Sequence, residues 1–349
     1  MPIRVLVVDD SVFMRSMLKS ALAGADGIEV VGTAMNGRDG LNKIKSLRPD
    51  VVTLDIEMPG LSGLEVLEQV MKDRPLPVVM VSTKTQKGAQ ATLDALKLGA
   101  IDYVAKPLGE RSATLESFRT KVLRAVEAAA HSNRQTLGHK PASITPPGGL
   151  DEIPPGSVVA IGISAGGPAT LHEMIPAIPQ RFPPIVITQH MPADFTEPFA
   201  KRLNNIAKVQ VMQAQTGQSL LPGELLIAPG NKHLRVVKKG SKLLAAVDDG
   251  PKVSGFRPSV DVLFESVATA VGPMAVGVIM TGMGCDGSVG VRLLKKQGAR
   301  TIAQDQATSI VYGMPKAAFQ TGCIDTVAPL QKIPIEIAHA LKHLCAMTH

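Results

Sequence analysis

The feature that most restricts the fold is a regular alternation between short apolar runs and segments of helical periodicity, which begins at residue 4. Five β-branched runs are each followed by a stretch whose apolar residues recur every three or four positions, as far as about residue 130. Such alternation requires parallel strands joined by crossover helices, and right-handed crossovers leave few arrangements besides a doubly wound sheet. We therefore predict a five-stranded parallel α/β domain with helices on both faces. The runs are RVLVV, IEVVGTA, VVTLD, VVMVS and DYVAK.

A second alternating region starts at residue 158, after a segment of different composition. Residues 131–157 contain five Pro and four Gly without an apolar period, a composition that buries too little surface to offset its ordering entropy. We expect domains at 1–125 and 158–349, joined by a linker over 126–157. Because the second domain also contains the hairpin-like runs ELLIAPG and LLAAVDDG, we predict an α/β/α, Rossmann-like fold with a β-hairpin insert.

Charge and cysteine content limit the class of protein. The net charge is +7 over 349 residues, and five cations fall in a predicted hairpin that turns near Gly240. A solvated hairpin face is favoured there over a surface for an acidic partner. The three cysteines form no C-x-x-C pair, so neither a disulfide framework nor a zinc site is indicated. No apolar run reaches the length of a membrane span, and we expect a cytoplasmic protein. The five cations are Lys232, Arg235, Lys238, Lys239 and Lys242.

Acidic residues follow the predicted strands of the first domain. Asp9 and Asp10 come after the first strand and Asp55 after the third, and the carboxyl ends of parallel strands share one edge of a sheet. Three neighbouring carboxylates repel one another and are the oxygen ligands that Mg²⁺ prefers. Ser82 and Lys106 follow the fourth and fifth strands and would receive a phosphoryl group attached to Asp55. Each aspartate alone would also suit a helix N-cap.

The stretch GISAGG around Ser164 raises a second question. Its glycines suit either a nucleophile elbow or a phosphate-binding turn. A dinucleotide site usually has an acidic residue at the end of the next strand, and this chain has Gln189 and His190 there. His190 and Asp286 instead supply a base and a carboxylate at the ends of further strands, as a serine hydrolase requires. Taken singly, each residue also has a structural explanation, as a turn serine, a surface histidine or a helix cap.

Four short motifs of the first half resemble the response-regulator receiver family over residues 1 to about 125. They are DD at 9–10, LDIEMPGLSG at 54–63, MVS at 80–82 and AKP at 105–107. The resemblance implies that a histidine kinase phosphorylates Asp55 and that Asp9, Asp10 and Asp55 bind Mg²⁺. It also implies that Ser82, Tyr103 and Lys106 couple phosphorylation to the rest of the protein.

The second half resembles the catalytic domain of the CheB family of chemotaxis protein-glutamate methylesterases. The motifs are IGISAGGP, TQHMP, FRPSVDVLF, MTGMGCDG and DQATSIVYGMPKAA. The resemblance implies that Ser164 is the nucleophile, His190 the base, Asp286 its orienting acid and the Met283 N–H an oxyanion donor, without a cofactor. It also implies that chemoreceptor γ-glutamyl methyl esters are hydrolysed to methanol under phosphorylation control, and that receptor glutamines are deamidated. Members commonly have Thr after the nucleophile, whereas this chain has Ala165, which is expected to affect the rate.

Two alternatives belong to other classes. A DNA-binding response regulator would share the first domain, but its output domain should be a helical reader with a basic face. A non-catalytic receptor adaptor would keep the fold and lose the chemistry. We expect the partners to be chemoreceptors and a chemotaxis histidine kinase, with no nucleic acid and no membrane insertion.

Overall fold

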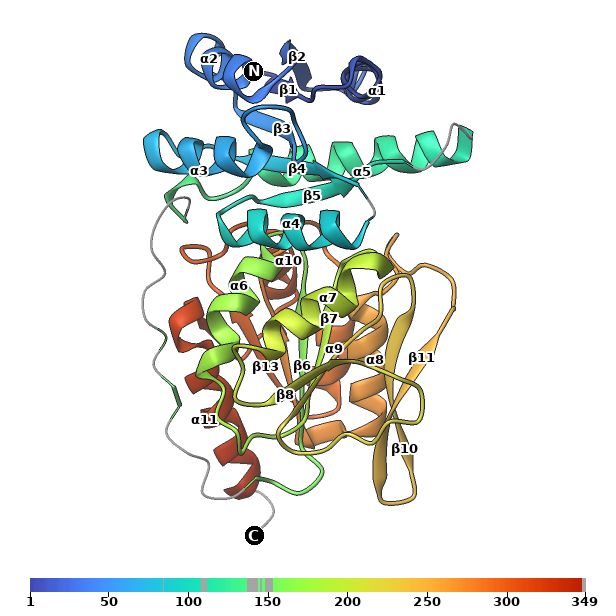
Figure 1. Ribbon diagram of the computed structural model, residues 1–349. Coiled ribbons are helices and arrows are strands. Elements are labelled where there is room, and N and C mark those ends of the chain that lie inside the picture. Colours follow the sequence, from blue (N-terminus) through green and yellow to red (C-terminus); the bar gives the residue numbers. More distant parts are fainter. Residues whose placement is uncertain (84, 108–111, 137–143, 145, 148–152, 347–349) are drawn as a thin grey trace. The chain divides into compact units, whose positions relative to one another are not determined.

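The computed structural model describes residues 1–83, 85–107, 112–136, 144, 146–147 and 153–346 (Figure 1). It divides into two compact units, Met1–Lys140 and Pro141–His349, which are described separately. Helix α5 (Ser112–Ala130) ends the regular part of the first unit. Much of the predicted linker lies outside the described residues, and the domain boundaries at 125 and 158 stay predictions.

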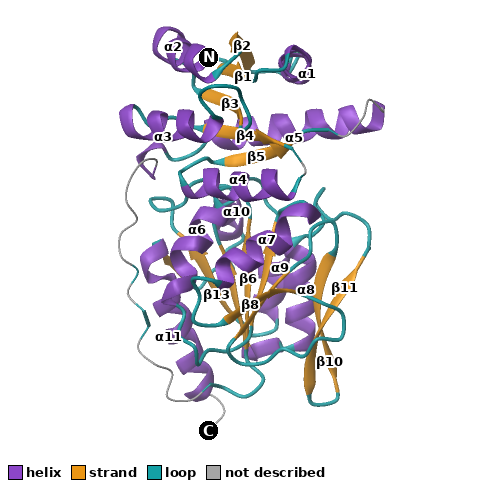
Figure 2. Ribbon diagram, viewed as in Figure 1, coloured by secondary structure: helices purple, strands orange, loops and turns teal. Residues whose placement is uncertain are grey.

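The first unit is the predicted doubly wound sheet, with five parallel strands in the order β2-β1-β3-β4-β5 (Figure 2). Helix α1 contacts α5, whereas α2 contacts α3 and α3 contacts α4, as expected for a sheet covered on both faces. Polar side chains begin the helices, and the clearest case is the capping box of Ser62 and Glu65 at α3. The remaining elements are β1 (Ile3–Val8), α1 (Val12–Leu22), β2 (Ile28–Ala34), α2 (Gly37–Leu47), β3 (Val51–Asp55), α3 (Gly63–Asp73), β4 (Val78–Ser82), α4 (Gln86–Lys97) and β5 (Asp102–Ala105).

The second unit is built on seven parallel strands in the order β14-β13-β12-β6-β7-β9-β8. Strand β6 is central, and all six of its residues are buried. From β6 the chain runs outward through β7 and later returns on the other side at β12, so the strand order reverses around β6. Crevices for ligands form at the carboxyl ends of strands at such a switch point. These central strands are β6 (Val158–Ile163), β7 (Ile185–Gln189) and β12 (Ala275–Ile279).

The helices and outer strands complete an α/β/α unit. Helix α8 contacts α9, α9 contacts α10, and α6 contacts α7. The elements are α6 (Gly167–Met174), α7 (Ala193–Asn204), β8 (Gln210–Gln213), β9 (Glu224–Ile227), α8 (Val260–Ala270), α9 (Ser288–Lys296), β13 (Arg300–Gln304), α10 (Met314–Gln320), β14 (Thr326–Ala328) and α11 (Ile333–Ala346).

The predicted β-hairpin insert is present, but one of its expected strands lies elsewhere. The hairpin consists of β10 (His233–Lys239) and β11 (Lys242–Asp248), which pair antiparallel and turn at Gly240. The run ELLI, which was expected to be hairpin-like, is β9 and pairs parallel with β7 and β8. That prediction was wrong because a short apolar run does not reveal its strand direction. The sequence also did not predict the short strands β8 and β14.

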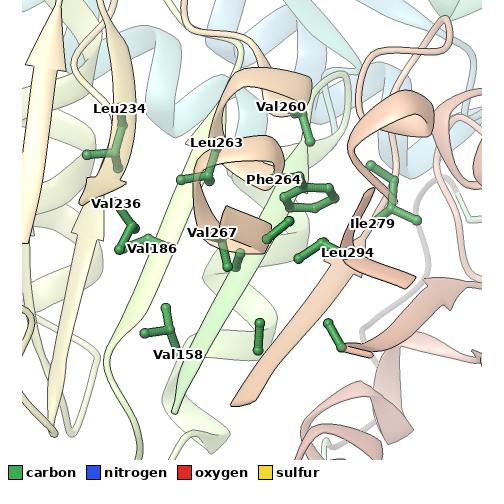
Figure 3. Close-up of a cluster of buried hydrophobic side chains, with 14 of the residues drawn as sticks. Val158, Val186, Leu234, Val236, Val260, Leu263, Phe264, Val267, Ile279 and Leu294 are labelled. Atoms are coloured by element: carbon green, nitrogen blue, oxygen red, sulfur yellow. The ribbon is translucent and has the colours of Figure 1, made fainter. Parts of the chain in front are cut away.

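Helix α8 connects the hairpin to the sheet. Leu263, Phe264 and Val267 of α8 are buried in one cluster with Leu234 and Val236 of β10 (Figure 3). Each such side chain contributes about 1.5–3 kcal/mol on burial. The first turn of α8 approaches the carboxyl end of β6 so closely that a side chain at position 162 would collide with Val260. The packing therefore holds the N-terminus of α8 at the edge of the sheet where β6 ends.

Among the described residues, no helix is both long enough and apolar enough to cross a lipid bilayer.

Candidate functional site

Three residues that are distant in the sequence, Ser164, His190 and Asp286, lie together at the carboxyl ends of the three central strands. Ser164 follows β6, His190 follows β7, and Asp286 lies in the loop after β12. A tight turn fixes Ser164, since its N–H donates to the Thr281 carbonyl at 2.9 Å and its own carbonyl accepts from the Gly167 N–H at 2.8 Å. Gly166 has φ of +75°, a backbone conformation that favours glycine. The turn therefore presents the hydroxyl at the end of a buried strand.

A hydrogen-bonded chain joins the three side chains. The Ser164 Oγ lies 3.0 Å from His190 Nδ1, and His190 Nε2 lies 2.7 Å from Asp286 Oδ2. Because an ionised carboxylate can only accept, the proton of neutral His190 resides on Nε2, and Nδ1 presents its lone pair to the serine hydroxyl. This is the arrangement in which an imidazole can take a proton from an attacking serine.

The N-terminus of α8 holds Asp286 in place. The carboxylate is buried and accepts from the Ser259 Oγ at 2.7 Å, the Val260 N–H at 2.7 Å and the Asp261 N–H at 3.1 Å. Although burial alone would raise the pKa of Asp286, the His190 hydrogen bond and charge, together with these donors, lower it below its usual value. Asp286 is therefore an ionised carboxylate that these donors hold in place beside His190 Nε2.

A second aspartate holds the loop that carries Asp286. Asp261 Oδ1 accepts from the Gly287 N–H at 2.9 Å and the Gly290 N–H at 2.8 Å, at the start of α9. Burial, together with the nearby charge of Asp286, raises the pKa of Asp261. Asp286 thus caps the N-terminus of α8, and Asp261 of α8 caps the N-terminus of α9.

The ring of Phe256 stacks on the imidazole of His190. The ring centroids are 3.8 Å apart and the planes differ by 6°, an aromatic pair at close range. The loop that carries Phe256 is held by Arg257, whose guanidinium donates to the Asp249 and Gly250 carbonyls at 2.9 and 3.0 Å and to Asn231 Oδ1 at 2.9 Å. The stack restricts the imidazole to the plane that contains both of its hydrogen-bond partners.

The loop after β12 brings backbone N–H groups close to the serine. Gly282 approaches so closely that a Cβ there would lie 2.8 Å from the Cβ of Ser164. Met283 follows it, half-buried, and in the described part of the chain its N–H has no hydrogen-bond acceptor. Ala165 is buried, and its carbonyl accepts from the Thr281 hydroxyl at 2.9 Å. Within the described residues, the Met283 N–H is therefore an unpaired donor in the loop that packs against Ser164.

The first unit contains the predicted acidic pocket. The carboxylate oxygens of Asp9, Asp10 and Asp55 lie within 4.8 Å of one another. Lys106 Nζ lies 2.8 Å from Asp55 Oδ2 and 3.1 Å from Asp9 Oδ2. Asp9 and Asp55 are almost fully buried. Three hard oxygen donors at this spacing fit a divalent cation such as Mg²⁺.

Burial has the largest effect on the pKa values of the aspartates in this pocket. It raises the pKa of Asp55 to about 6, with a contribution from the charge of Asp9, and also raises the pKa of Asp9. Burial alone would lower the pKa of Lys106, but its hydrogen bond to Asp55 and the two carboxylates raise it overall. A cation in the pocket would offset the repulsion between the carboxylates.

Ser82 and Tyr103, the two other residues predicted for this pocket, lie on the paired strands β4 and β5. Ser82 ends β4 and is buried, and its hydroxyl donates to the Gly88 carbonyl of α4 at 3.1 Å. Tyr103 lies half-buried on β5. Ser82 therefore connects the strand end to α4, whereas the coupling roles of both residues stay predictions.

Sequence reasoning assigned no role to Phe256, Ser259 or Asp261. Ser259 had a local signal, since a serine before an apolar helical run is typical of an N-cap. Phe256 had none, because its role depends on a contact with His190, which is distant in the sequence.

Comparison with known proteins gives concordant results for both units. Residues 159–337 match the family described as CheB methylesterase, and residues 5–116 match the response regulator receiver domain. A protein-glutamate methylesterase/protein-glutamine glutaminase of Caulobacter vibrioides is 48% identical over 332 residues, which cover 95% of this chain and 96% of that protein. A protein of the same description from Sulfurimonas denitrificans is 43% identical over 352 residues, covering 98% and 99%.

A solved structure is similar to the second unit. The crystal structure of the Thermotoga maritima CheB methylesterase catalytic domain is 38% identical, with a TM-score of 0.52, and the match covers 52% of this chain and 97% of that one. The predicted α/β fold class is thereby confirmed at the level of both architecture and sequence.

Proposed function

Because this chain belongs to the CheB methylesterase family, we propose that it hydrolyses γ-methyl esters of glutamate residues in chemoreceptors, with Ser164 as the nucleophile. The observation that carries this proposal is the hydrogen-bonded chain from Ser164 through His190 to Asp286. The names of the relatives pair this activity with glutamine deamidation, and both reactions use the same acyl chemistry with a different leaving group.

In the first half-reaction Ser164 Oγ attacks the ester carbonyl carbon while His190 Nδ1 takes its proton. The negative charge that develops on the carbonyl oxygen is stabilised by the Met283 N–H, which has no acceptor within the described part of the protein. Collapse of this intermediate breaks the bond to the methoxy oxygen, which leaves as methanol with the proton from His190. Asp286 stabilises the imidazolium that exists between these two transfers.

In the second half-reaction water cleaves the acyl-enzyme. His190 Nδ1 takes a proton from the water as its oxygen attacks the acyl carbon, and then returns that proton to Ser164 Oγ. The product is a glutamate carboxylate. With a glutamine substrate the first leaving group is ammonia, and the second half-reaction is unchanged.

The test of the nucleophile is Ser164→Ala, assayed by methanol release from a methyl-esterified chemoreceptor fragment. The rate is expected to fall by at least about 10³-fold. Ser288→Ala, which alters a half-buried serine at the start of α9, is the matched control and should retain activity. Methanol release that survives Ser164→Ala would refute the assignment.

We further propose that phosphorylation of Asp55 controls the esterase. A carboxylate oxygen of Asp55 attacks the phosphorus of a kinase phosphohistidine, the phosphorus–nitrogen bond breaks, and the imidazole of the kinase leaves. Asp9, Asp10 and Asp55 would hold Mg²⁺, which would neutralise phosphoryl charge when bound. Lys106 lies 2.8 Å from Asp55 and supplies a fixed positive charge beside the acceptor.

The control is tested with a small phosphodonor such as acetyl phosphate. Asp55→Asn should keep basal methanol release and lose its stimulation by the donor, whereas Ser164→Ala should still incorporate phosphate and release no methanol. Stimulation of the Asp55→Asn variant equal to that of the wild type would refute control through this residue.

The two rival functions give different outcomes in the same assays. A DNA-binding regulator would bind duplex DNA in a salt-sensitive manner, and a receptor adaptor would bind receptor without releasing methanol. A cytoplasmic location, where the receptor segments and kinase would be accessible, stays part of this proposal.

A further inference from the structure

A polar cleft lies beside the catalytic edge of the second unit. It has a volume of about 380 Å³ and is lined by the first turn of α7, the ends of β8 and β11, and the loop after β9. At its base the Thr196 hydroxyl donates to Gln213 Oε1 at 2.9 Å and accepts from the Gly230 N–H at 3.3 Å. Gln213 uses its carbonyl oxygen in this network, and no acceptor in the described residues takes its amide N–H groups. The cleft thus has a rigid base with donors left for a ligand.

Two chain segments connect this cleft to the catalytic residues. His190 lies only three residues before Ala193, which lines the cleft. The other segment, residues 229–232, packs so closely on the start of α7 that a side chain at position 230 would collide with Ala193. Within this segment, Asn231 Oδ1 accepts a hydrogen bond from the Arg257 guanidinium, which also holds the loop that carries Phe256. Adjacent strands are about 4.8 Å apart, so the end of β9 lies roughly 10 Å from the end of β6.

The charge of the cleft favours an acidic ligand. Its lining contains Lys232 and no acidic residue. Within the described residues, Lys232 forms one ion pair, with Asp249 at 3.7 Å. Both side chains are about half exposed or more, so this pairing has little energetic value. The ammonium group is therefore available to a second carboxylate.

We propose that this cleft is a substrate subsite that binds the polypeptide on one side of the reacting glutamate, with Lys232 contacting an acidic side chain of that segment. The inference rests on the proposed esterase function. Substrates whose reaction yields glutamate carboxylates present such side chains. The amide groups of Gln213 and Gln215, which line the cleft, can donate hydrogen bonds to the accompanying backbone.

The experiment compares a protein substrate with a small ester for each variant. Methanol release is measured from a methyl-esterified chemoreceptor fragment and from N-acetylglutamate γ-methyl ester α-amide, which is too small to reach the cleft while bound at Ser164. Lys232→Glu reverses the charge and Gln215→Trp fills the cleft at an exposed position. Lys239→Glu makes the same charge change at an exposed residue of β10, about 20 Å along the strand from its start.

For Lys232→Glu and Gln215→Trp, the KM of the protein substrate should rise about fivefold more than that of the small ester, with little change in kcat. The Lys232→Glu effect should shrink at high salt, because the contact is partly exposed. An equal response of Lys232→Glu and Lys239→Glu with the protein substrate, or an equal loss with both substrates, would overturn the subsite. Failure of the wild type to release methanol from either substrate would instead refute the proposed function.

Discussion

Replacing Phe256 tests whether the stacked ring positions His190, the proposed base. Phe256→Ala removes a ring that lies 3.8 Å from the His190 ring and almost parallel to it. The stack is worth about 0.5–1.5 kcal/mol, which corresponds to a roughly 2- to 12-fold change in the population of the correctly oriented imidazole. A displacement of about 1 Å in a catalytic group lowers a rate by about 10²-fold. We therefore expect kcat to fall by at least about 2-fold, from the population change alone, and by up to about 100-fold where the imidazole is also displaced.

The assay is steady-state methanol release, with the rate at which a fluorophosphonate labels Ser164 as a second readout. Both rates should fall together, and KM should change by less than about threefold, since the ring acts on the base. Phe256→Tyr retains the flat ring and should stay within about twofold of the wild type. Phe256→Leu keeps apolar volume without the flat face and should be intermediate. A Phe256→Ala variant with wild-type kcat, or a Phe256→Tyr variant as slow as Phe256→Ala, would refute the positioning argument.

Two further substitutions concern the buried carboxylate of Asp286 and the half-buried carboxylate of Glu173. Asp286→Asn should lower kcat by about 10³- to 10⁴-fold. Each Asp286 oxygen accepts a backbone N–H of α8, so the NH₂ group of the asparagine would face a hydrogen-bond donor in either orientation of the amide. A drop of less than tenfold in methanol release would contradict this. Glu173→Gln should raise the urea midpoint at pH 8. Burial raises the pKa of Glu173 to about 7 from 4.5. The folded state therefore loses stability as pH rises from 4.5 to about 7, by about 1 kcal/mol after allowance for partial exposure. At pH 5 the two proteins should differ much less, and an equal shift at both pH values would contradict the assignment.

Much of the site could be predicted because parallel strands place their carboxyl ends on one edge. Asp9, Ser164 and His190 follow recognisable strands and Asp55 ends one. The structure brings Asp9 together with Asp55, and Ser164 together with His190. These inferences need only local periodicity and the handedness of crossovers. The same apolar periodicity predicted the helices. The capping box of Ser62 and Glu65 is a further local signal that the sequence analysis did not use.

The tertiary structure decided what depends on contacts between distant segments. Strand order around β6 and the parallel pairing of β9 result from the packing of whole layers, which a short apolar run does not encode. The choice of Nδ1 for Ser164 and Nε2 for Asp286 depends on where α8 holds the carboxylate. Phe256 on His190 is a contact of the same kind. The sequence by itself therefore determined which chemical groups meet at the sheet edge, and only three-dimensional packing determined how they are oriented and what surrounds them.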